Sequence, residues 1–252
     1  MTTKSLYQLF KSHPESNYIM EYQNVVLLYK FIKNHPIKRI LDLGTGLGLS
    51  ASVCALALKD KGEIDYKIDS VEQFDKCIKI ADKLIPPELK EHITIHKSNT
   101  RVWQHPKIPY QFFSNYETLP EPPAQGWDFI INDGPCFWLE GDTFVDLPNG
   151  TITEIMDRIK PGTFIAWDGR IHALQLLERY FADNFELYRS NQRGDDFNVL
   201  RRLDTPQNFR DDRLKGIKDT STFFKGLYEK ETIAPLDGST AQSEDATANQ
   251  GA

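Results

Sequence analysis

The feature that most constrains this chain is a glycine-rich turn between a short apolar run and a helical pattern. The apolar run, residues 40–43, is interrupted only by Asp42, and three glycines follow it at alternate positions: Gly44, Gly46 and Gly48. Glycine accepts positive φ angles and lets a ligand approach the backbone closely. The helix predicted from Ser50 offers unpaired N–H groups at its N-terminus. Because an acid would repel phosphate, Asp42 favours a ligand with a cationic or hydroxyl-bearing part.

The glycine spacing separates two kinds of nucleotide site. A dinucleotide fingerprint has the pattern G-x-G-x-x-G, whereas here the third glycine is Gly48, and Leu49 stands where that pattern needs glycine. The segment from Asp42 to Gly48 resembles the first motif of class I S-adenosylmethionine (SAM)-dependent methyltransferases. With Leu49 and Ser50 it is similar to small-molecule O-methyltransferases of the catechol and macrocin type, which carry an acid, two glycines and a serine at these spacings. The resemblance implies SAM as the cofactor.

Composition narrows the class of protein. The 252 residues are enough for one sizeable α/β domain, and the net charge of −6 argues against nucleic acid as the main partner. The N-terminus lacks the apolar core of a signal peptide, and no run reaches transmembrane length. The three cysteines are widely spaced, which disfavours a zinc site. We therefore expect a cytoplasmic protein without a membrane partner.

Hydrophobic patterns predict alternating strands and helices. Strands are expected at 38–43, 64–71, 92–96, 127–132 and 163–167, with a hairpin of 185–189 and 197–203. Helical patterns cover 74–84, 152–159 and 171–181. This order predicts a doubly wound, mostly parallel, seven-stranded sheet with an antiparallel C-terminal hairpin, a Rossmann-like methyltransferase fold. The resemblance places the SAM-binding domain at residues 37–203.

Other segments flank or interrupt this domain. Residues 1–36 are expected to form an N-terminal helical cap of two helices, and 204–230 a C-terminal helical extension. Residues 231–252 lack an apolar pattern and are predicted to be a disordered tail. Residues 101–126 contain five prolines and predict a long connection, either functional or disordered. With 136–148, this connection would complete the cap.

Polar residues follow the carboxyl ends of the predicted parallel strands, where open α/β sheets bind ligands. They are Asp42, Glu72, Ser98, Asn99, Asp133 and Asp168. The resemblance implies that Glu72 accepts hydrogen bonds from the ribose hydroxyls, that Ser98 or Asn99 faces the adenine, and that Ser50 helps bind the methionine carboxylate. Asp133 counts among the cofactor-binding residues. The alternative is that these side chains only cap turns or helices.

The acids Asp133 and Asp168 match the two carboxylate ligands of metal-dependent O-methyltransferases, which bind Mg²⁺ and two substrate hydroxyls. Gly169 stands where that family has its third ligand. The residues that could substitute for this ligand are Asn132, Asp142 and Asp146. The alternative to a metal site is that Asp133 acts directly as general base or substrate anchor.

A catalytic base is less clearly marked. Cys136 stands where the family often has lysine or histidine, whereas His172 follows Asp168 by four residues and titrates near neutral pH. Arg170 is suited to pair with an acidic substrate group or with Asp133. The expected function is SAM-dependent O-methylation of a small-molecule or sugar hydroxyl. The alternatives are a SAM- or nucleotide-binding module without catalysis and an NAD-dependent oxidoreductase, and a homodimer is compatible with each.

Overall fold

A seven-stranded sheet organises the molecule. The computed structural model describes residues 1–108, 112–135, 137–140, 143–168, 171–189 and 197–206. The strands run in the order β10-β11-β9-β6-β1-β2-β3, and all are parallel except β11, which pairs antiparallel with β9 and β10. Their bounds are Arg39–Leu43 (β1), Lys67–Glu72 (β2), Ile93–Lys97 (β3), Phe129–Asn132 (β6), Phe164–Asp168 (β9), Phe185–Arg189 (β10) and Phe197–Arg202 (β11). The sheet predicted from the sequence, with its antiparallel C-terminal hairpin, is confirmed.

The order of the strands reverses between β1 and β6. From β1 the chain proceeds outward to β2 and β3, then crosses back to β6 on the other side of β1 and proceeds outward to β9. Such a reversal separates the loops that leave the two central strands, and ligands of open α/β sheets bind in the crevice that results. The turn after β1 and the residues after β6 are therefore the expected walls of the site.

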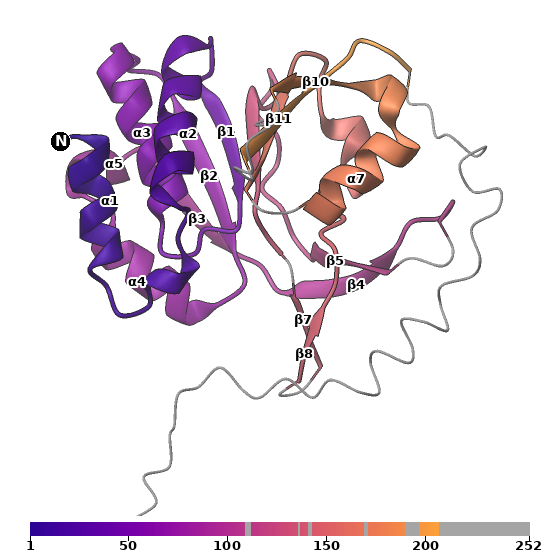
Figure 1. Cartoon of the computed structure of the whole chain (residues 1–252), viewed down its shortest axis with the longest axis horizontal. Helices are drawn as coiled ribbons and strands as arrows, with labels where there is room; N and C mark the ends of the chain where they lie inside the picture. The colour runs from indigo at the N-terminus through magenta and orange to yellow at the C-terminus, as the bar shows by residue number, and fades with distance from the viewer. Residues whose placement is uncertain (109–111, 136, 141–142, 169–170, 190–196, 207–252) are drawn as a thin grey trace, which may run out of the picture.

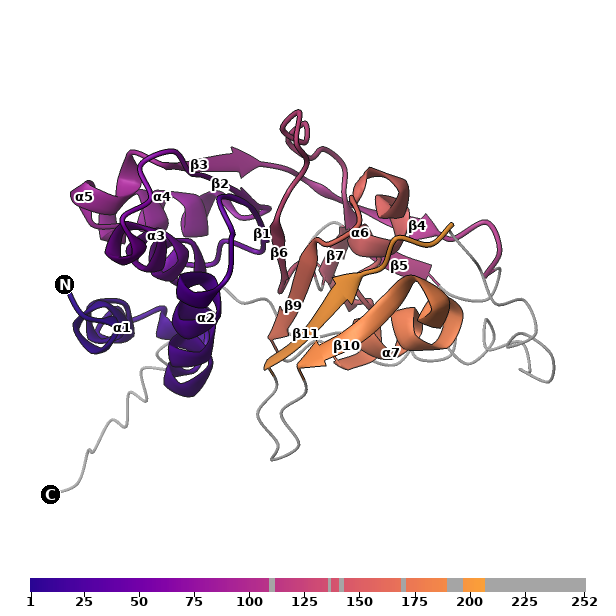
Figure 2. The same ribbon diagram turned by 90° about the horizontal axis from the view of Figure 1, so that it is seen from above.

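Five helices cover one face of the sheet (Figures 1 and 2). They are α1 (Thr3–Lys11), α2 (Tyr22–Asn34), α3 (Leu49–Lys61), α4 (Asp75–Leu84) and α5 (Pro87–Lys90). Helix α3 is buried from Leu49 to Leu58. Its Ala- and Ser-rich sequence has small side chains on all sides, so it fits between α2 and the sheet, as a helix without a polar face must. The two helices predicted within residues 1–36 are confirmed.

The opposite face is covered differently. The predicted long connection at 101–126 is in part a β-hairpin, β4 (Thr100–Gln104) and β5 (Phe112–Tyr116), which packs on this face beside α7 (Ile171–Tyr180) (Figure 2). The prolines that suggested an irregular segment all lie outside the two strands, and β5 is buried from Phe113 to Tyr116. A second hairpin, β7 (Phe137–Glu140) and β8 (Thr143–Asp146), follows β6.

Several boundaries differ from the predicted ones. Strand β2 begins at Lys67 rather than Ile64, whose side chain is 89% exposed. The helix expected at 152–159 is a short α6 (Thr151–Glu154) followed by a 3-10 turn (Met156–Arg158), because Ile155 leaves helical geometry. Two further 3-10 turns are Ser16–Tyr18 and Ala182–Asn184. The predicted extension at 204–230, beyond Pro206, and the tail at 231–252 lie outside the described residues.

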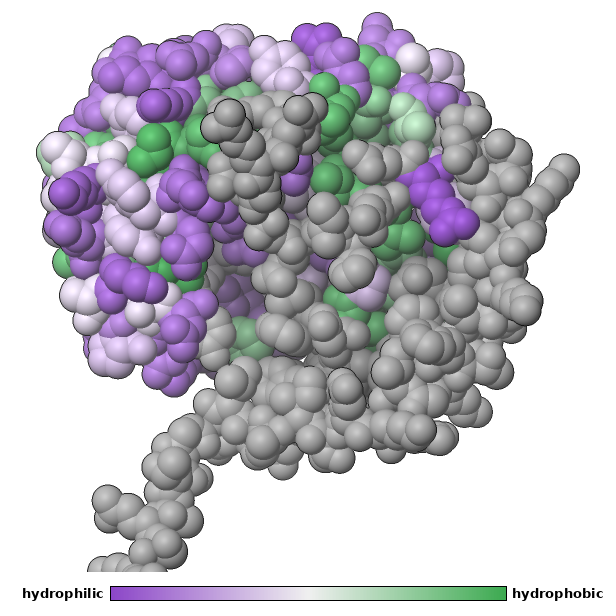
Figure 3. Space-filling view, in the orientation of Figure 1, coloured by the Kyte–Doolittle hydropathy of each residue, from purple (hydrophilic) through white to green (hydrophobic). Residues whose placement is uncertain are grey.

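The surface over the helical face is mostly hydrophilic, with scattered apolar side chains (Figure 3). None of the helices that the structure describes combines the length and the apolar character needed to cross a bilayer. Cys54 and Cys77 are buried and free, and Cys136 lies outside the described residues.

Candidate functional site

Four acids follow the carboxyl ends of parallel strands on one face of the sheet. Side chains two residues apart on a strand point the same way. The core residue two positions before an acid, Ile40, Ile131 or Ala166, belongs in each case to the cluster beneath α1–α5, and Ile68 stands in the same alternation on β2. The acids that continue this alternation are Asp42, Glu72, Asp133 and Asp168. They therefore lie on the helical face of the sheet, at the edge where the parallel strands end, and the charges of Glu72 and Asp133 act on Asp42.

Asp42 is fully buried and lies at the centre of a hydroxyl network. Its Oδ2 accepts hydrogen bonds from Ser70 Oγ at 2.7 Å and from Ser50 Oγ at 2.9 Å. Thr45 Oγ1 lies 2.6 Å from Ser70 Oγ, and because the Ser70 proton is given to Asp42, Thr45 is the donor. Asp42 Oδ1 is buried with no hydrogen-bond partner among the described residues. A buried, half-satisfied carboxylate is costly unless a ligand completes it.

The charge around Asp42 points to the kind of ligand. Burial raises the pKa of Asp42 to about 7, and the negative charges of Asp133 and Glu72 add to this rise. The hydrogen bonds from Ser70 and Ser50 oppose the rise because they stabilise the ionised form. Three carboxylates that repel one another would be relieved by a cation. A ligand with an ammonium or sulfonium group therefore fits, whereas a phosphate does not.

Glu72 is held by backbone N–H groups at the mouth of the glycine turn. Its Oε2 accepts from Gly46 N at 2.8 Å, and its Oε1 accepts from the amides of Gln73 and Phe74, each at 2.8 Å. Burial raises the pKa of Glu72, and these backbone bonds oppose the rise. Oε1 already accepts two hydrogen bonds, whereas Oε2 accepts one, so the fixed carboxylate retains capacity for a ribose hydroxyl at Oε2.

The outer glycines of the turn are required by packing. Gly44 has a φ of +102°, and a Cβ there would lie 2.8 Å from the backbone nitrogen of Gly134. Gly48 has a φ of +92°, and a Cβ there would lie 2.9 Å from the side chain of Ile85. These two positions close the turn against its neighbours, which leaves Gly46 as the glycine beside the Glu72 carboxylate.

At the end of β3 the two predicted adenine contacts differ in their surroundings. Ser98 is buried, its hydroxyl donates to the carbonyl of Asn99 at 2.9 Å, and it accepts from both the amide and the hydroxyl of Thr118. This hydroxyl therefore joins the base of the β4–β5 hairpin. Asn99 is exposed and available to a ligand. Trp103 on β4 packs against Phe113 on β5 at a ring distance of 5.7 Å.

Two polar side chains near the predicted site residues were not predicted from the sequence. Both side-chain amide atoms of Gln73 are buried and have no hydrogen-bond partner among the described residues. Gln73 directly follows Glu72, and that position in the sequence was a signal. Asn24 on α2 is 3% exposed, and its Nδ2 donates to Asp168 Oδ1 at 2.7 Å. No sequence pattern links residues 144 positions apart.

The predicted metal ligands follow neighbouring strands. The amides of Asp133 and Gly134 donate to Leu43 O, which fixes the segment after β6 against β1. Strands β6 and β9 are parallel neighbours with Ile131 beside Ala166, so Asp133 and Asp168 continue adjacent register positions. Within the described part of the chain, no group of three His, Cys, Asp or Glu residues is placed to hold a metal ion.

Several predicted residues cannot be assigned a place in the site. His172 is the second residue of α7, and the position of its side chain lies outside the description, as do Gly169, Arg170, Cys136 and the side chains of Asp142 and Asp146. Asn132 is buried as the last residue of β6, next to Leu43 on β1. The alternation of β6 turns Asn132 away from the face that carries Asp133.

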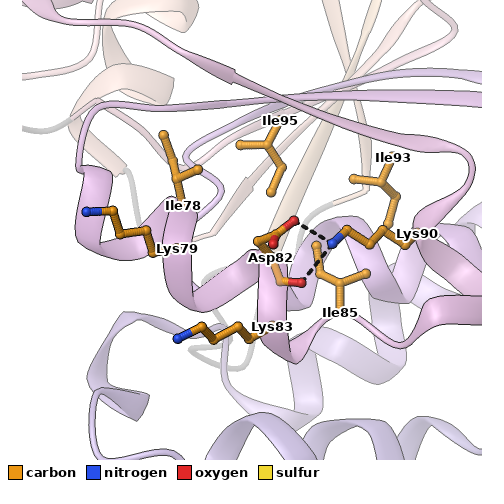
Figure 4. A pocket seen from close by; sticks show the side chains of 8 residues that line it. All are labelled: Ile78, Lys79, Asp82, Lys83, Ile85, Lys90, Ile93 and Ile95. Atoms are coloured by element: carbon orange, nitrogen blue, oxygen red, sulfur yellow. Dashed lines mark hydrogen bonds and ion pairs between the residues drawn. The ribbon is translucent and has the colours of Figure 1, made fainter.

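A groove of about 510 Å³ lies away from these acids (Figure 4). It is bounded by β3, α4 and α5, with an apolar floor that includes Ile78 and Ile95 and with Lys90 paired to Asp82 at its rim. Because it faces the middle of β3 rather than the carboxyl ends of the strands, it is not part of the candidate site.

Solved structures share this fold. No family model matches the sequence, and no curated protein matches it. An O-methyltransferase from Bacillus cereus in complex with SAH (S-adenosylhomocysteine) is 14% identical, with a TM-score of 0.51 over 80% of this chain and 90% of that one. The SAM-bound O-methyltransferase TomG from Streptomyces achromogenes is 14% identical, with a TM-score of 0.50 over 81% and 91%. The SAH-bound methyltransferase PaMTH1 from Podospora anserina is 13% identical, with a TM-score of 0.50 over 80% and 88%. At this identity the likeness establishes a methyltransferase fold.

Proposed function

We propose that the protein is a SAM-dependent O-methyltransferase that acts on a hydroxyl group of a small molecule or sugar. The observation that carries the proposal is the buried carboxylate of Asp42, one oxygen of which has no partner in the part of the chain that the structure describes. This carboxylate also lies close enough to Glu72 and Asp133 for their charges to raise its pKa. SAM supplies a methyl group on a sulfonium centre and carries a cationic amino group. The O-methyltransferases with the same fold, crystallised with SAM or SAH, support this assignment.

Each part of the cofactor has a matching group. Asp42 Oδ1 accepts from the amino group, and the N–H groups in the first turn of α3 donate to the carboxylate. The Ser50 hydroxyl already donates to Asp42, so its backbone N–H is the better partner for that carboxylate. Glu72 binds the ribose hydroxyls, and Asn99 with Gln73 binds the adenine, since amides can both donate and accept.

Asp133 is the proposed acceptor-side residue. It follows β6 at the crevice, close enough to Asp42 to raise the pKa of that acid. SAM, when bound, would supply the methyl group to an acceptor oxygen and leave as SAH, with the electron pair of the broken carbon–sulfur bond on sulfur. Asp133 would take the proton of the acceptor hydroxyl. His172 remains a second candidate for this base.

Cofactor binding is tested by thermal unfolding with SAH and, separately, with NAD. We expect SAH to raise the melting temperature through linkage and NAD to leave it unchanged. Gly46→Val should abolish the SAH effect, because it places a branched side chain beside Glu72 at a φ of +51°. Gly62→Val is the matched control, since Gly62 also has a positive φ but open space around it. Stabilisation by NAD alone would contradict the proposal.

Catalysis is tested with SAM that carries a labelled methyl group, offered with catechols, flavonoid phenols and simple glycosides. Transfer of label to oxygen in one of these classes, with release of SAH, is the expected result. SAH binding without transfer to any acceptor would favour the alternative of a SAM-binding module. Transfer to nitrogen or carbon acceptors alone would contradict O-methylation while leaving the cofactor assignment intact.

A further inference from the structure

Asn24 connects the N-terminal helices to the acceptor side of the site. It lies in the first turn of α2, is 3% exposed, and donates from Nδ2 to Asp168 Oδ1 at 2.7 Å. Its Oδ1 is buried and has no partner among the described residues. The hydrogen bond to the carboxylate offsets part of the cost of burying this amide.

The bond fixes the last residue of β9 from outside the sheet. Helix α2 packs on α3, whose first turn carries Ser50, the donor to Asp42. The N-terminal segment therefore reaches both the cofactor side, through α3, and the acceptor side, through Asn24. A hydrogen bond from an amide to a carboxylate is charge-assisted and holds the acid in one orientation.

The same bond takes up one oxygen of Asp168, which matters for a metal centre built on that acid. A magnesium ion bound by protein needs oxygen ligands in near-octahedral geometry. The residue after Asp168 is Gly169, which has no side chain to offer. Among the described residues, the Asn24 nitrogen lies at Asp168 Oδ1, and an amide N–H cannot ligate a cation. Because no group of three His, Cys, Asp or Glu residues in the described part of the chain is placed to hold a metal ion, this bond fits a hydrogen-bonded carboxylate better than a metal-bound one.

We propose that Asn24 is the positioning residue of Asp168 and that it stands in place of a divalent cation at the acceptor side. The inference rests on the proposed function. In this arrangement the acceptor hydroxyl contacts the Asp168 carboxylate, which the Asn24 amide holds in one orientation. Helix α2 is then part of the site rather than a cover over it.

The test measures metal binding directly, so it does not depend on the acceptor. The full chain with SAH is titrated with Mn²⁺ and followed by electron paramagnetic resonance, for the wild type, Asp168→Asn and Asn24→Asp. We expect the wild type and Asp168→Asn to bind Mn²⁺ equally weakly. Asn24→Asp should bind it on the order of tenfold or more tightly, because it adds an oxygen ligand beside Asp168. Adding Asp168→Asn to that variant should abolish the gain in Mn²⁺ affinity. A merely structural role for Asn24 predicts neither the gain nor its loss.

Tight Mn²⁺ binding by the wild type that Asp168→Asn removes would overturn the inference, and so would an Asn24→Asp variant that gains no affinity. Should Asn24→Asp fail to fold, the comparison of wild type with Asp168→Asn still decides. Stabilisation by SAH is recorded on the same samples. If SAH has no effect, the proposed function fails, whereas SAH binding together with a wild-type metal site contradicts only the role of Asn24.

Discussion

Gly44 and Gly134 pack directly against each other, backbone to backbone. A Cβ built on Gly44 would lie 2.8 Å from the nitrogen of Gly134, and one built on Gly134 would lie 2.9 Å from the Cα of Gly44 and 2.8 Å from the hydroxyl of Tyr116. The two glycines belong to the loops that leave β1 and β6, on either side of the strand-order reversal. Their contact sets how closely the two walls of the site approach.

We predict that Gly44→Ala and Gly134→Ala each destabilise the fold, measured as the free energy of unfolding in urea. Overpacking of a tight contact costs about 1–3 kcal/mol. Gly44→Ala should be the more severe change, because its φ of +102° adds roughly 1–2 kcal/mol of backbone strain.

Gly62→Ala is the control for that strain, since Gly62 has a φ of +84° with nothing within 4 Å of a new Cβ. It should lose about 1 kcal/mol from the backbone alone. Equal losses for Gly44→Ala and Gly62→Ala would show that the glycine–glycine contact is not tight in solution.

The second prediction concerns Asp42→Asn. Because burial raises the folded-state pKa of Asp42 from 3.8 to about 7, the folded state binds a proton that the unfolded state has lost. The contribution of Asp42 to stability is therefore present below pH 4, declines as the pH rises toward 7, and is level above that. The variant keeps an oxygen that accepts from Ser50 and Ser70 but carries no charge. Its stability relative to the wild type should increase between pH 5 and pH 8, measured by urea unfolding at each pH.

The same substitution should have the opposite effect on the cofactor. Ionised Asp42 is the proposed partner of the ligand's amino group, so SAH affinity of the wild type should rise as the pH rises through 7. Asp42→Asn should bind SAH at least about tenfold more weakly at pH 8, the loss of one charge-assisted bond. Calorimetry that finds equal affinity in the two proteins would remove Asp42 from the cofactor site.

The fold was predictable because its main signals are local. The apolar runs at 40–43 and 129–132, the glycine turn and the helical stripes each predict one element from a short stretch of sequence. Their order along the chain then predicts the parallel sheet. The β4–β5 hairpin was missed because prolines dominated the composition of 101–126, although they all lie outside the two strands. The pairing of β4 with β5 depends on packing against the sheet, and a short stretch of sequence does not predict such packing.

The site was predictable only in part, for a similar physical reason. The acids at strand ends follow from period-two alternation and the direction of parallel strands, so Asp42 and Glu72 could be placed from the sequence. The roles of Ser98 and Asn24 could not, because each depends on a partner brought close by tertiary packing: Thr118 in the hairpin for one and Asp168 for the other. Such tertiary contacts produce no periodic pattern in the sequence.

The third prediction separates Ser98 from Asn99. Ser98→Ala removes a buried hydroxyl that links three groups at the hairpin base, so it should lower the free energy of unfolding by about 1–3 kcal/mol with little change in SAH affinity. Asn99→Ala removes an exposed amide, so it should leave stability within about 0.5 kcal/mol of the wild type and weaken SAH binding. The reverse pattern, in calorimetry and urea unfolding, would place the adenine contact at Ser98.

The last prediction concerns Asp133→Asn and uses the charge coupling between two acids. The negative charge of Asp133 contributes to the raised pKa of Asp42, so its removal should lower the pKa of Asp42 and shift the pH midpoint of SAH binding downward. The variant should bind SAH at pH 8 about as well as the wild type. Its rate of methyl transfer should fall by about 10²–10⁴, the usual contribution of a positioned base.

Asp65→Asn is the matched control, because Asp65 is also an acid but its side chain is 77% exposed and paired with Arg39 at the start of β1. It removes one negative charge far from the crevice and should change neither the pH midpoint nor the rate. A downward midpoint shift with full activity would leave Asp133 as an electrostatic neighbour of the cofactor and give the proton to another group, with His172 the first to test. Full activity and an unchanged midpoint together would mean that Asp133 only closes the loop against Leu43, to which its backbone N–H donates.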